Sequence, residues 1–227
     1  MAVGDVLSEA LDLYQRFFRR FVLIAASVFV LVDLLAAIAA DARGGSRPVF
    51  ALWTLVYVLI ALIGAFWVQG ALVAAVQDAR DGKLDRKIGD LYDSVRPRLP
   101  ALIAAGVLAG VGAGIGLVLF VVPGLILLTR WILIAPVIVL EGRRASEAFK
   151  RSAELVKGNG RPVFGVIVST LLIGIVAHGV LIRIFAFLPA FAANWAGGLL
   201  ADSLVTPFVA LSWTVMYFQL SQKSKAA

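Results

Sequence analysis

The chain has 227 residues and a net charge of +7; 61% of its residues are hydrophobic and only 15% are charged. A soluble protein of this size carries roughly 25% charged residues, so the composition excludes a water-soluble globular domain. Cysteine is absent, which excludes disulfides, thiolate metal sites and cysteine nucleophiles.

Long apolar runs recur along the whole chain, and runs of about 18 residues or more are typical of transmembrane helices. Strands of a membrane barrel would alternate apolar and polar residues, and these runs do not alternate. We therefore expect an all-α fold: a polytopic membrane helix bundle that occupies residues 1–227 as a single membrane domain. The spans that we predict, about six in all, cover residues 21–40, 49–76, 101–122, 125–140, 163–184 and 198–220.

The first apolar run has an alternative interpretation as a secretion signal, with the small residues at positions 37–41 as its cleavage site. A secretion signal has a short basic start and an apolar stretch of about 7–15 residues. Here about 20 residues precede an apolar run that is itself about 20 residues long. We therefore expect the run to be retained as the first span.

Prolines mark the expected ends and bends of the spans. Pro48 stands where the second span begins, a position that suits the first turn of a helix. The pair Pro123-Gly124 separates the third and fourth runs and predicts a tight reversal there. A single kinked helix is the alternative, but it would be about 40 residues long, twice what a bilayer requires. Pro207 predicts a kink in the last span.

Most of the 21 Lys and Arg residues lie on one side of this topology, in residues 16–20, 80–98, 143–161 and the tail after residue 220. The positive-inside rule places that side in the cytoplasm. We predict a multi-pass protein of the cytoplasmic (inner) membrane with both termini in the cytoplasm. The positive charge is then a topology signal, and nucleic acid is not an expected partner.

Three segments on the basic side combine apolar residues at helical spacing with charged residues: residues 4–20, 88–99 and 146–157. Such helices lie in the membrane interface, with the apolar face down and the basic residues near anionic lipid. We expect amphipathic interfacial helices on the cytoplasmic side. Their role is either plain anchoring or the binding of membrane lipids, anionic ones above all, or of a protein partner.

The same three segments resemble one another. Residues 4–7 compare with residues 89–92, and residues 20–26 compare with residues 98–105 with one gap, while the third copy is degenerate. Repeats related by an axis along the membrane normal are a known way to build membrane folds. The pattern predicts three units in one orientation, each an interfacial helix followed by a helical hairpin.

Five ionisable residues fall inside the predicted spans: Asp33, Arg130, His178, Arg183 and Asp202. An ionisable group in hydrocarbon costs at least ~2.5–3.5 kcal/mol, so each of them needs a physical explanation. With a helix rise of about 1.5 Å per residue, all five fall in the outer half of the bilayer. With one His and no Cys in the chain, we expect no metal site.

Two interpretations of these five residues remain open. Charge pairs inside the bundle would fix helix register, with Arg183 reaching outward to water. A polar cavity open to the outside would instead bind an ion or a headgroup. In either case we expect Asp33, Arg130 and Asp202 to form a compensated charge group that faces the bundle interior.

Gly106, Gly110 and Gly114 lie four residues apart on the third span. Small residues at this spacing let helix backbones approach closely. They indicate close packing within the monomer or, alternatively, a face for self-association.

Glu141, Glu147 and Arg151 follow the fourth span. We predict that they form a structural hub on the cytoplasmic side, with Glu141 paired to Arg151 or to a nearby Arg. The hub would tie the interfacial helix to the bundle rather than carry out catalysis.

The stretch from residue 122 to residue 165 is the most distinctive part of the chain. It contains Pro123-Gly124, Arg130-Trp131, Pro136, Glu141-Gly142, Glu147-Ala148, Arg151-Ser152, Leu155 and Gly158-Asn159. These motifs resemble a widespread group of bacterial six-helix integral membrane proteins of unknown function, and also the membrane domain fused to some glycerophosphodiester phosphodiesterases. The resemblance implies a six-helix membrane fold. It does not imply phosphodiesterase activity, because nothing here resembles the soluble catalytic domain of those fusions.

The spacing of serines, the single histidine and the aspartates supports no catalytic triad, and the glycine run at residues 112–116 lacks the lysine of a phosphate loop. We expect a membrane protein that is not an enzyme, uses no cofactor, and binds lipid or a protein partner. One alternative is a small transporter or channel that uses the outer-half polar cluster. Another is an intramembrane enzyme that acts on a lipid.

Overall fold

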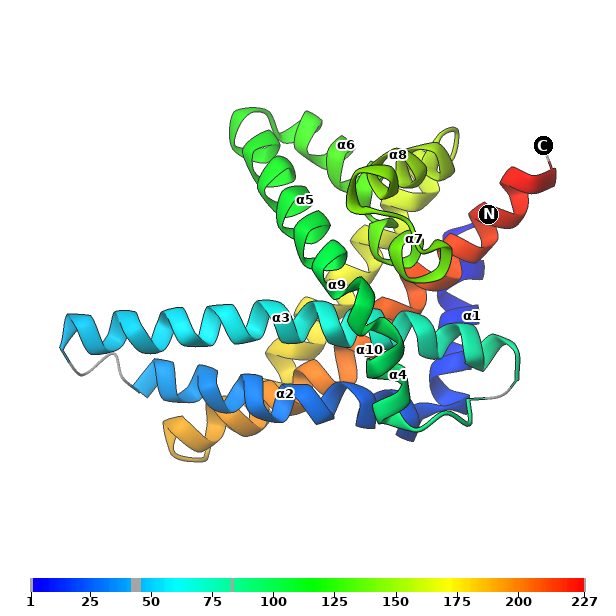
Figure 1. Cartoon of the computed structure of the whole chain (residues 1–227). Coiled ribbons are helices and arrows are strands. Elements are labelled where there is room, and N and C mark those ends of the chain that lie inside the picture. The colour runs from blue at the N-terminus through cyan, green and yellow to red at the C-terminus, as the bar shows by residue number, and fades with distance from the viewer. Residues whose placement is uncertain (1, 42–45, 83, 227) are drawn as a thin grey trace.

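The computed structural model describes residues 2–41, 46–82 and 84–226, and every regular element in them is helical (Figure 1). Six helical segments are long and apolar enough to cross a membrane, which confirms the predicted all-α helix bundle. These segments are Phe18–Asp41, Arg47–Arg80, Ile88–Leu119, Val121–Glu141, Gly160–Ile184 and Ala190–Ser224.

The element order repeats three times, each time as a short helix followed by a helical hairpin. The first unit is α1 (Val3–Arg16), α2 (Phe18–Asp41) and α3 (Arg47–Arg80). The second is α4 (Ile88–Val95), the 3-10 turn η2 (Arg96–Arg98), α5 (Leu99–Leu119), α6 (Val121–Trp131) and α7 (Ile134–Glu141). The third is α8 (Ala145–Val156), α9 (Gly160–Ile184) and α10 (Ala190–Ala226). This order agrees with the repeat predicted from the sequence.

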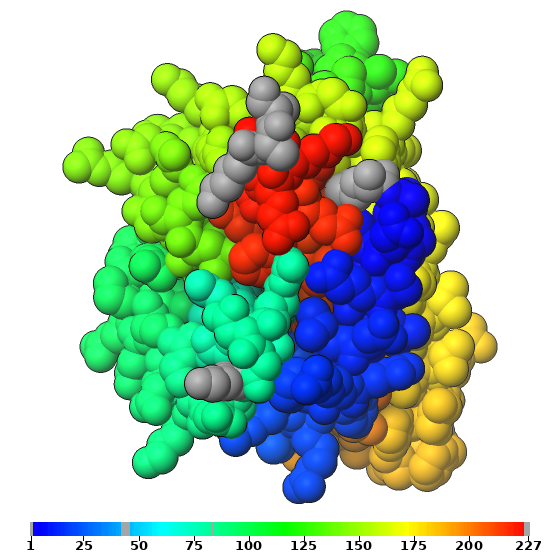
Figure 2. Space-filling model, turned by 90° about the vertical axis from the view of Figure 1, so that its right-hand side faces the viewer, coloured from blue at the N-terminus to red at the C-terminus, as the bar shows by residue number. Residues whose placement is uncertain are grey.

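The short helices and the C-terminal part of α10 gather at one end of the molecule, which we call the basic end (Figure 1). Figure 2 looks at this end, where the C-terminal part of α10, in red, lies beside α1, in blue. The α2–α3 and α9–α10 hairpins extend together away from the basic end, whereas the α5–α6 hairpin splays off in another direction (Figure 1).

Each short helix packs on the hairpin of the preceding unit, so the three units close in a cyclic order. Helix α1 packs on α9 and α10, α4 packs on α3, and α8 packs on α5, α6 and α7. A side-chain hydroxyl on each short helix donates to a backbone carbonyl of that preceding unit. The pairs are Tyr14 to Leu204 at 2.9 Å, Tyr92 to Ile24 at 2.6 Å and Ser152 to Arg130 at 2.6 Å.

The sequence of each short helix explains which face it buries. Apolar residues spaced three or four apart fall on one side of a helix, and it is this side that faces the bundle. The buried residues are Val6 and Ala10 in α1, Leu91, Tyr92 and Val95 in α4, and Ala148, Ser152, Leu155 and Val156 in α8. Burial raises the pKa of Tyr14 to about 12, so its hydroxyl keeps the proton that it donates.

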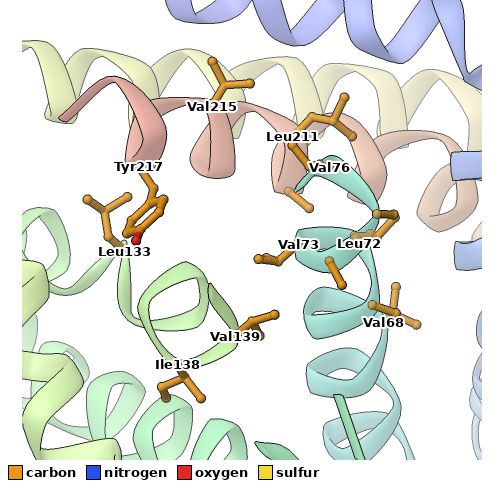
Figure 3. Packing of buried hydrophobic residues seen from close by; sticks show 14 of the residues in the cluster. Val68, Leu72, Val73, Val76, Leu133, Ile138, Val139, Leu211, Val215 and Tyr217 are labelled. Carbon is orange, nitrogen blue, oxygen red and sulfur yellow. The ribbon is translucent and has the colours of Figure 1, made fainter. Parts of the chain in front are cut away.

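The buried core lies toward the basic end. Figure 3 shows the second half of α3 beside α7 and α10, with buried residues around it that include Val68, Leu72, Val73, Val76, Val139 and Leu211. The first half of α3 and the far end of α5 instead expose large apolar residues, such as Leu52 and Val118. Such surfaces suit contact with lipid chains.

The chain reverses between the third and fourth spans at Phe120, slightly before the predicted Pro123-Gly124 turn. Phe120 is extended, with φ −151° and ψ 114°, and α6 begins at the next residue. Pro123 lies in the first turn of α6, where a missing N–H is tolerated. Gly124 does not form the turn. It packs against α5 so closely that a Cβ at this position would collide with the backbone of Leu117.

The fourth span is not the continuous helix predicted over residues 125–140, because the chain breaks at residues 132–133 between α6 and α7. Pro136 has no N–H to offer the carbonyl of Ile132, and its ring crowds that carbonyl. The hydroxyl of Ser152, which is fully buried, fills the break. It donates to the carbonyl of Arg130 at 2.6 Å and accepts the N–H of Leu133 at 3.2 Å.

Replacing Ser152 by Ala should lower the free energy of unfolding by about 1–3 kcal/mol, because two buried backbone groups lose their partner. Ser94→Ala is the matched control, since the Ser94 hydroxyl bonds only within its own helix, to Leu91. Thermal unfolding in detergent, followed by tryptophan fluorescence, measures both variants. Equal losses for the two would show that Ser152 does not bridge the break.

Candidate functional site

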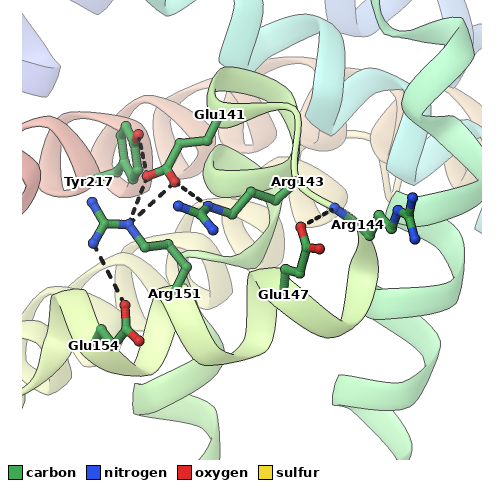
Figure 4. A network of polar contacts seen from close by, with 7 residues as sticks. All are labelled: Glu141, Arg143, Arg144, Glu147, Arg151, Glu154 and Tyr217. Carbon is green, nitrogen blue, oxygen red and sulfur yellow. Dashed lines mark hydrogen bonds and ion pairs between the residues drawn. The ribbon is translucent and has the colours of Figure 1, made fainter.

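A polar network joins α7, α8 and α10 at the basic end (Figure 4). The carboxylate of Glu141 accepts hydrogen bonds from Arg143 at 2.7 Å, from Arg151 at 3.1 Å and from the Tyr217 hydroxyl at 3.0 Å. The hydrogen bond to Glu141 raises the pKa of Arg143, so this pair stays ionised. The network therefore holds α8 against the end of α7 and against α10.

Glu147 stands apart from this network, although the sequence grouped it with Glu141 and Arg151. Its carboxylate accepts the backbone N–H of Arg144 at 3.4 Å, at the start of α8 (Figure 4). A carboxylate in the first turn also complements the helix dipole. Glu147 thus shapes the helix that carries Arg151 without touching Glu141.

A cavity of about 910 Å³ opens between α6, α8 and the start of α9. Its apolar wall comes from α6 and α9, and its polar rim comes from the end of α6, α8 and the α8–α9 turn. The apolar lining includes Val122, Leu125, Ile126, Val156 and Phe164. The charged lining is Arg130, Lys150, Glu154, Lys157 and Arg161.

The rim of the cavity is electropositive. Within the described part of the chain, Arg130, Lys150, Lys157 and Arg161 form no ion pair. The one acid of the rim, Glu154, faces Arg151 at 3.8 Å. Among the described residues the rim therefore carries four cations and one carboxylate, so its net charge is positive.

The start of α9 adds to this positive potential. The α8–α9 turn contains Gly158 with φ 79°, a left-handed conformation that glycine adopts without strain. Gly160 and Arg161, the first two residues of α9, line the cavity. Their N–H groups belong to the first turn of a helix, where no intrahelical acceptor exists and the dipole favours an anion.

The structure does not place Arg130 in the expected charge group with Asp33 and Asp202. Arg130 lies near the end of α6, where it lines the cavity with the basic residues of α8 and α9. Among the described residues, no ion pair joins it to Asp33 or Asp202. The expected compensated group of these three residues therefore does not form, because the early reversal and the break after Trp131 carry Arg130 toward α8.

Three of the other predicted polar residues gather where α2, α9 and α10 meet. The carboxyl group of Asp33 on α2 faces Gly198 of α10, one helical turn before Asp202, and Nδ1 of His178 lies 3.8 Å from Oδ1 of Asp202. Arg183 is exposed near the end of α9, without an ion pair among the described residues. Asp33, His178 and Asp202 thus form a cluster that neither arginine joins.

The three glycines that the sequence places four residues apart have different surroundings in the structure. A Cβ on Gly106 would collide with the ring of Phe66 on α3, so this glycine serves packing within the monomer. Gly110 and Gly114 have open space around their Cα atoms. Gly112, which lies between them, packs against Trp131 of α6.

The cavity was not predicted from the sequence, although the residues of the α8–α9 turn indicate an anion site. Lys157, Gly158 and Arg161 were treated only as topology markers and as part of a family motif. A glycine turn flanked by two cations just before an apolar helix predicts an anion site at a helix N-terminus. The bridging role of Ser152 was not predicted, because a single sequence does not reveal its hydrogen-bond partners at the α6–α7 break.

Residues 91–220 match the family model of a domain of unknown function, DUF7847. This region is more than half of the chain. The chain belongs to this family. The DUF7847 region begins in α4 and ends in α10, so it contains the Glu141 network and all residues of the cavity. No curated protein and no solved structure matches the chain.

Replacing Glu141 by Gln should lower the free energy of unfolding by about 1–3 kcal/mol, because Arg151 and Tyr217 then face a neutral amide. Glu154→Gln is the control, since its carboxylate is exposed and lies 3.8 Å from Arg151, a geometry worth less than about 1 kcal/mol. Circular dichroism during thermal unfolding in detergent measures both. A control variant as unstable as Glu141→Gln would contradict a special role for the network.

Proposed function

We propose that this integral membrane protein binds an anionic lipid at its basic end, in the cavity between α6, α8 and α9, and that it acts as a binding protein rather than as an enzyme. The observation that carries the proposal is the pairing of an apolar wall with four unpaired cations around one cavity. A molecule that matches both parts is an amphiphile with a negatively charged head.

The apolar wall accounts for the chain of such a lipid. Val122, Leu125 and Ile126 come from the membrane-spanning helix α6, and Phe164 comes from the first turns of α9. Acyl chains that lie along these residues would exchange the hydrocarbon of the bilayer for an equally apolar protein surface. Chain contacts therefore orient the lipid without deciding which headgroup is preferred.

The basic residues of the cavity rim would bind the headgroup. Arg130 provides planar, paired N–H donors that suit phosphate oxygens, and Lys157 and Arg161 flank the free N–H groups at the start of α9. A basic residue near a bilayer surface contributes ~1 kcal/mol to the attraction of anionic lipid. A phosphate without a compensating headgroup cation is therefore the favoured ligand, and a zwitterionic headgroup is disfavoured.

We place the basic end in the cytoplasm, because Lys and Arg are concentrated in the segments around α1, α4, α8 and the end of α10. The lipid would then be drawn from the cytoplasmic leaflet of the inner membrane. Both chain termini lie at this end of the molecule (Figure 1).

The double variant Lys157→Gln/Arg161→Gln should weaken binding of phosphatidylglycerol by roughly tenfold to thirtyfold. Two lost charges remove ~2 kcal/mol, and about 1.4 kcal/mol corresponds to a tenfold change in affinity. Native mass spectrometry of the protein in detergent, titrated with phosphatidylglycerol or phosphatidylcholine, gives the two dissociation constants.

The matched control is Lys87→Gln/Arg96→Gln, which removes the same charge from exposed residues near α4, outside the cavity. It should leave the preference for phosphatidylglycerol unchanged. A control variant that weakens binding as much as the cavity variant would replace the site with a diffuse surface attraction. No preference in the unaltered protein would refute the proposal.

Topology can be tested with reporters placed at the two ends of the molecule. Alkaline phosphatase fused after Phe187, in the α9–α10 turn, should be active, because this turn would lie outside. A fluorescent protein fused to the C-terminus should fold and fluoresce, because it would stay in the cytoplasm. The reverse pattern would place the basic end, and the lipid cavity with it, on the outer side.

A further inference from the structure

A second polar group lies away from the basic end, and the lipid cavity makes no use of it. Asp33 in α2 is only 7% exposed, and its Oδ2 atom is buried without a hydrogen-bond partner among the described residues. Its carboxyl group points at α10, where a Cβ on Gly198 would lie 3.2 Å from Oδ1 of Asp33. Glycine at this position therefore lets the carboxyl group approach the backbone of α10.

Asp202 lies one helical turn after Gly198, on the same face of α10. The carboxyl group of Asp33 faces α10 one turn before Asp202, and Oδ1 of Asp202 lies 3.8 Å from Nδ1 of His178 on α9. Tyr57 on α3 is a further titratable group near both aspartates. Helices α2, α3, α9 and α10 thus all contribute a titratable side chain to one place.

Two carboxyl groups on neighbouring turns of packed helices cannot readily both stay ionised, because their like charges repel strongly where water is scarce. Ionisation inside a membrane costs at least ~2.5–3.5 kcal/mol even for one group. A single proton held between Asp33 and Asp202 removes the repulsion. It also gives the buried Oδ2 of Asp33 a chemical role, as the atom that carries or accepts this proton.

We propose that Asp33, Asp202 and His178 form a proton-binding site. One proton is shared between the two carboxyl groups, and the imidazole of His178 lies beside the carboxylate of Asp202. The side chains of His178 and Asp202 are 41% and 34% exposed, so other parts of the protein do not enclose them fully. Because the carboxyl pair joins α2 to α10, its proton also links the first and third units.

Dicyclohexylcarbodiimide tests the site directly. The reagent takes the proton of a carboxylic acid in apolar surroundings, the carboxyl oxygen bonds to the carbodiimide carbon, and rearrangement leaves a stable N-acylurea. The protein in detergent is treated between pH 5.5 and pH 9, and modified peptides are identified by mass spectrometry. We expect one adduct on the Asp33–Asp202 pair at pH 7.5, decreasing at higher pH, whereas the exposed Asp12 of α1 should remain unlabelled at pH 7.5.

Two variants should shift this labelling in opposite directions. Asp33→Asn removes the repulsion, so Asp202 ionises and its labelling at pH 7.5 should fall at least tenfold. His178→Gln removes the imidazole that faces the carboxylate of Asp202 at 3.8 Å and favours its ionised form, so labelling should persist to higher pH. Asp12→Asn is the control and should leave the pH profile unchanged.

If Asp33→Asn does not fold, the pH profile of the unaltered protein and of His178→Gln still decides the matter. Absence of adducts on both aspartates throughout the pH range would refute the proposal. Labelling that sodium ions suppress at constant pH would also refute it, because the site would then bind a metal cation instead of a proton.

Discussion

The break in the fourth span is the constraint on which the basic end depends. Inside a membrane, a backbone group that loses its helical partner has no water to replace it. Pro136 interrupts the helix at residues 132–133, and the buried hydroxyl of Ser152 satisfies both Arg130 and Leu133. This hydroxyl fixes α8 against α6. Tyr14 and Tyr92 make comparable long-range hydrogen bonds to α10 and α2, so the three units close on one another.

The position of α8 in turn creates the cavity. Because α8 is anchored to α6 by Ser152 and to α7 and α10 by the Glu141 network, the turn after it is held beside α6. That turn begins α9 with free N–H groups and places Lys157 and Arg161 opposite Arg130. The same contacts that stabilise the bundle therefore assemble a site in which apolar wall and positive rim meet, and the lipid binding that we propose depends on how the third unit docks on the second.

The structural features that depend on a local sequence pattern could be predicted. Hydropathy located the membrane-spanning helices, and the similarity of the segments near residues 4 and 89 predicted the repeated order of elements. The position of Arg130 at the cavity could not be predicted, because charge balance alone favoured pairing with the aspartates, and helix rise placed all three residues at a similar depth. Their separation depends on a reversal that falls earlier than Pro123 and on a break that Ser152 fills from a distant helix. Such contacts join residues far apart in the chain, and no periodicity records them.

Photo-crosslinking tests the lipid cavity most directly. The protein is reconstituted with a trace of phosphatidylglycerol that carries a diazirine in its acyl chain, irradiated, and digested for mass spectrometry. We expect adducts concentrated on the wall of the cavity, at Val122, Ile126 and Phe164, and we expect excess phosphatidylglycerol, but not phosphatidylcholine, to suppress them. Adducts spread along the exposed apolar faces of α3 and α5, or suppressed equally by both lipids, would contradict a specific anionic-lipid site.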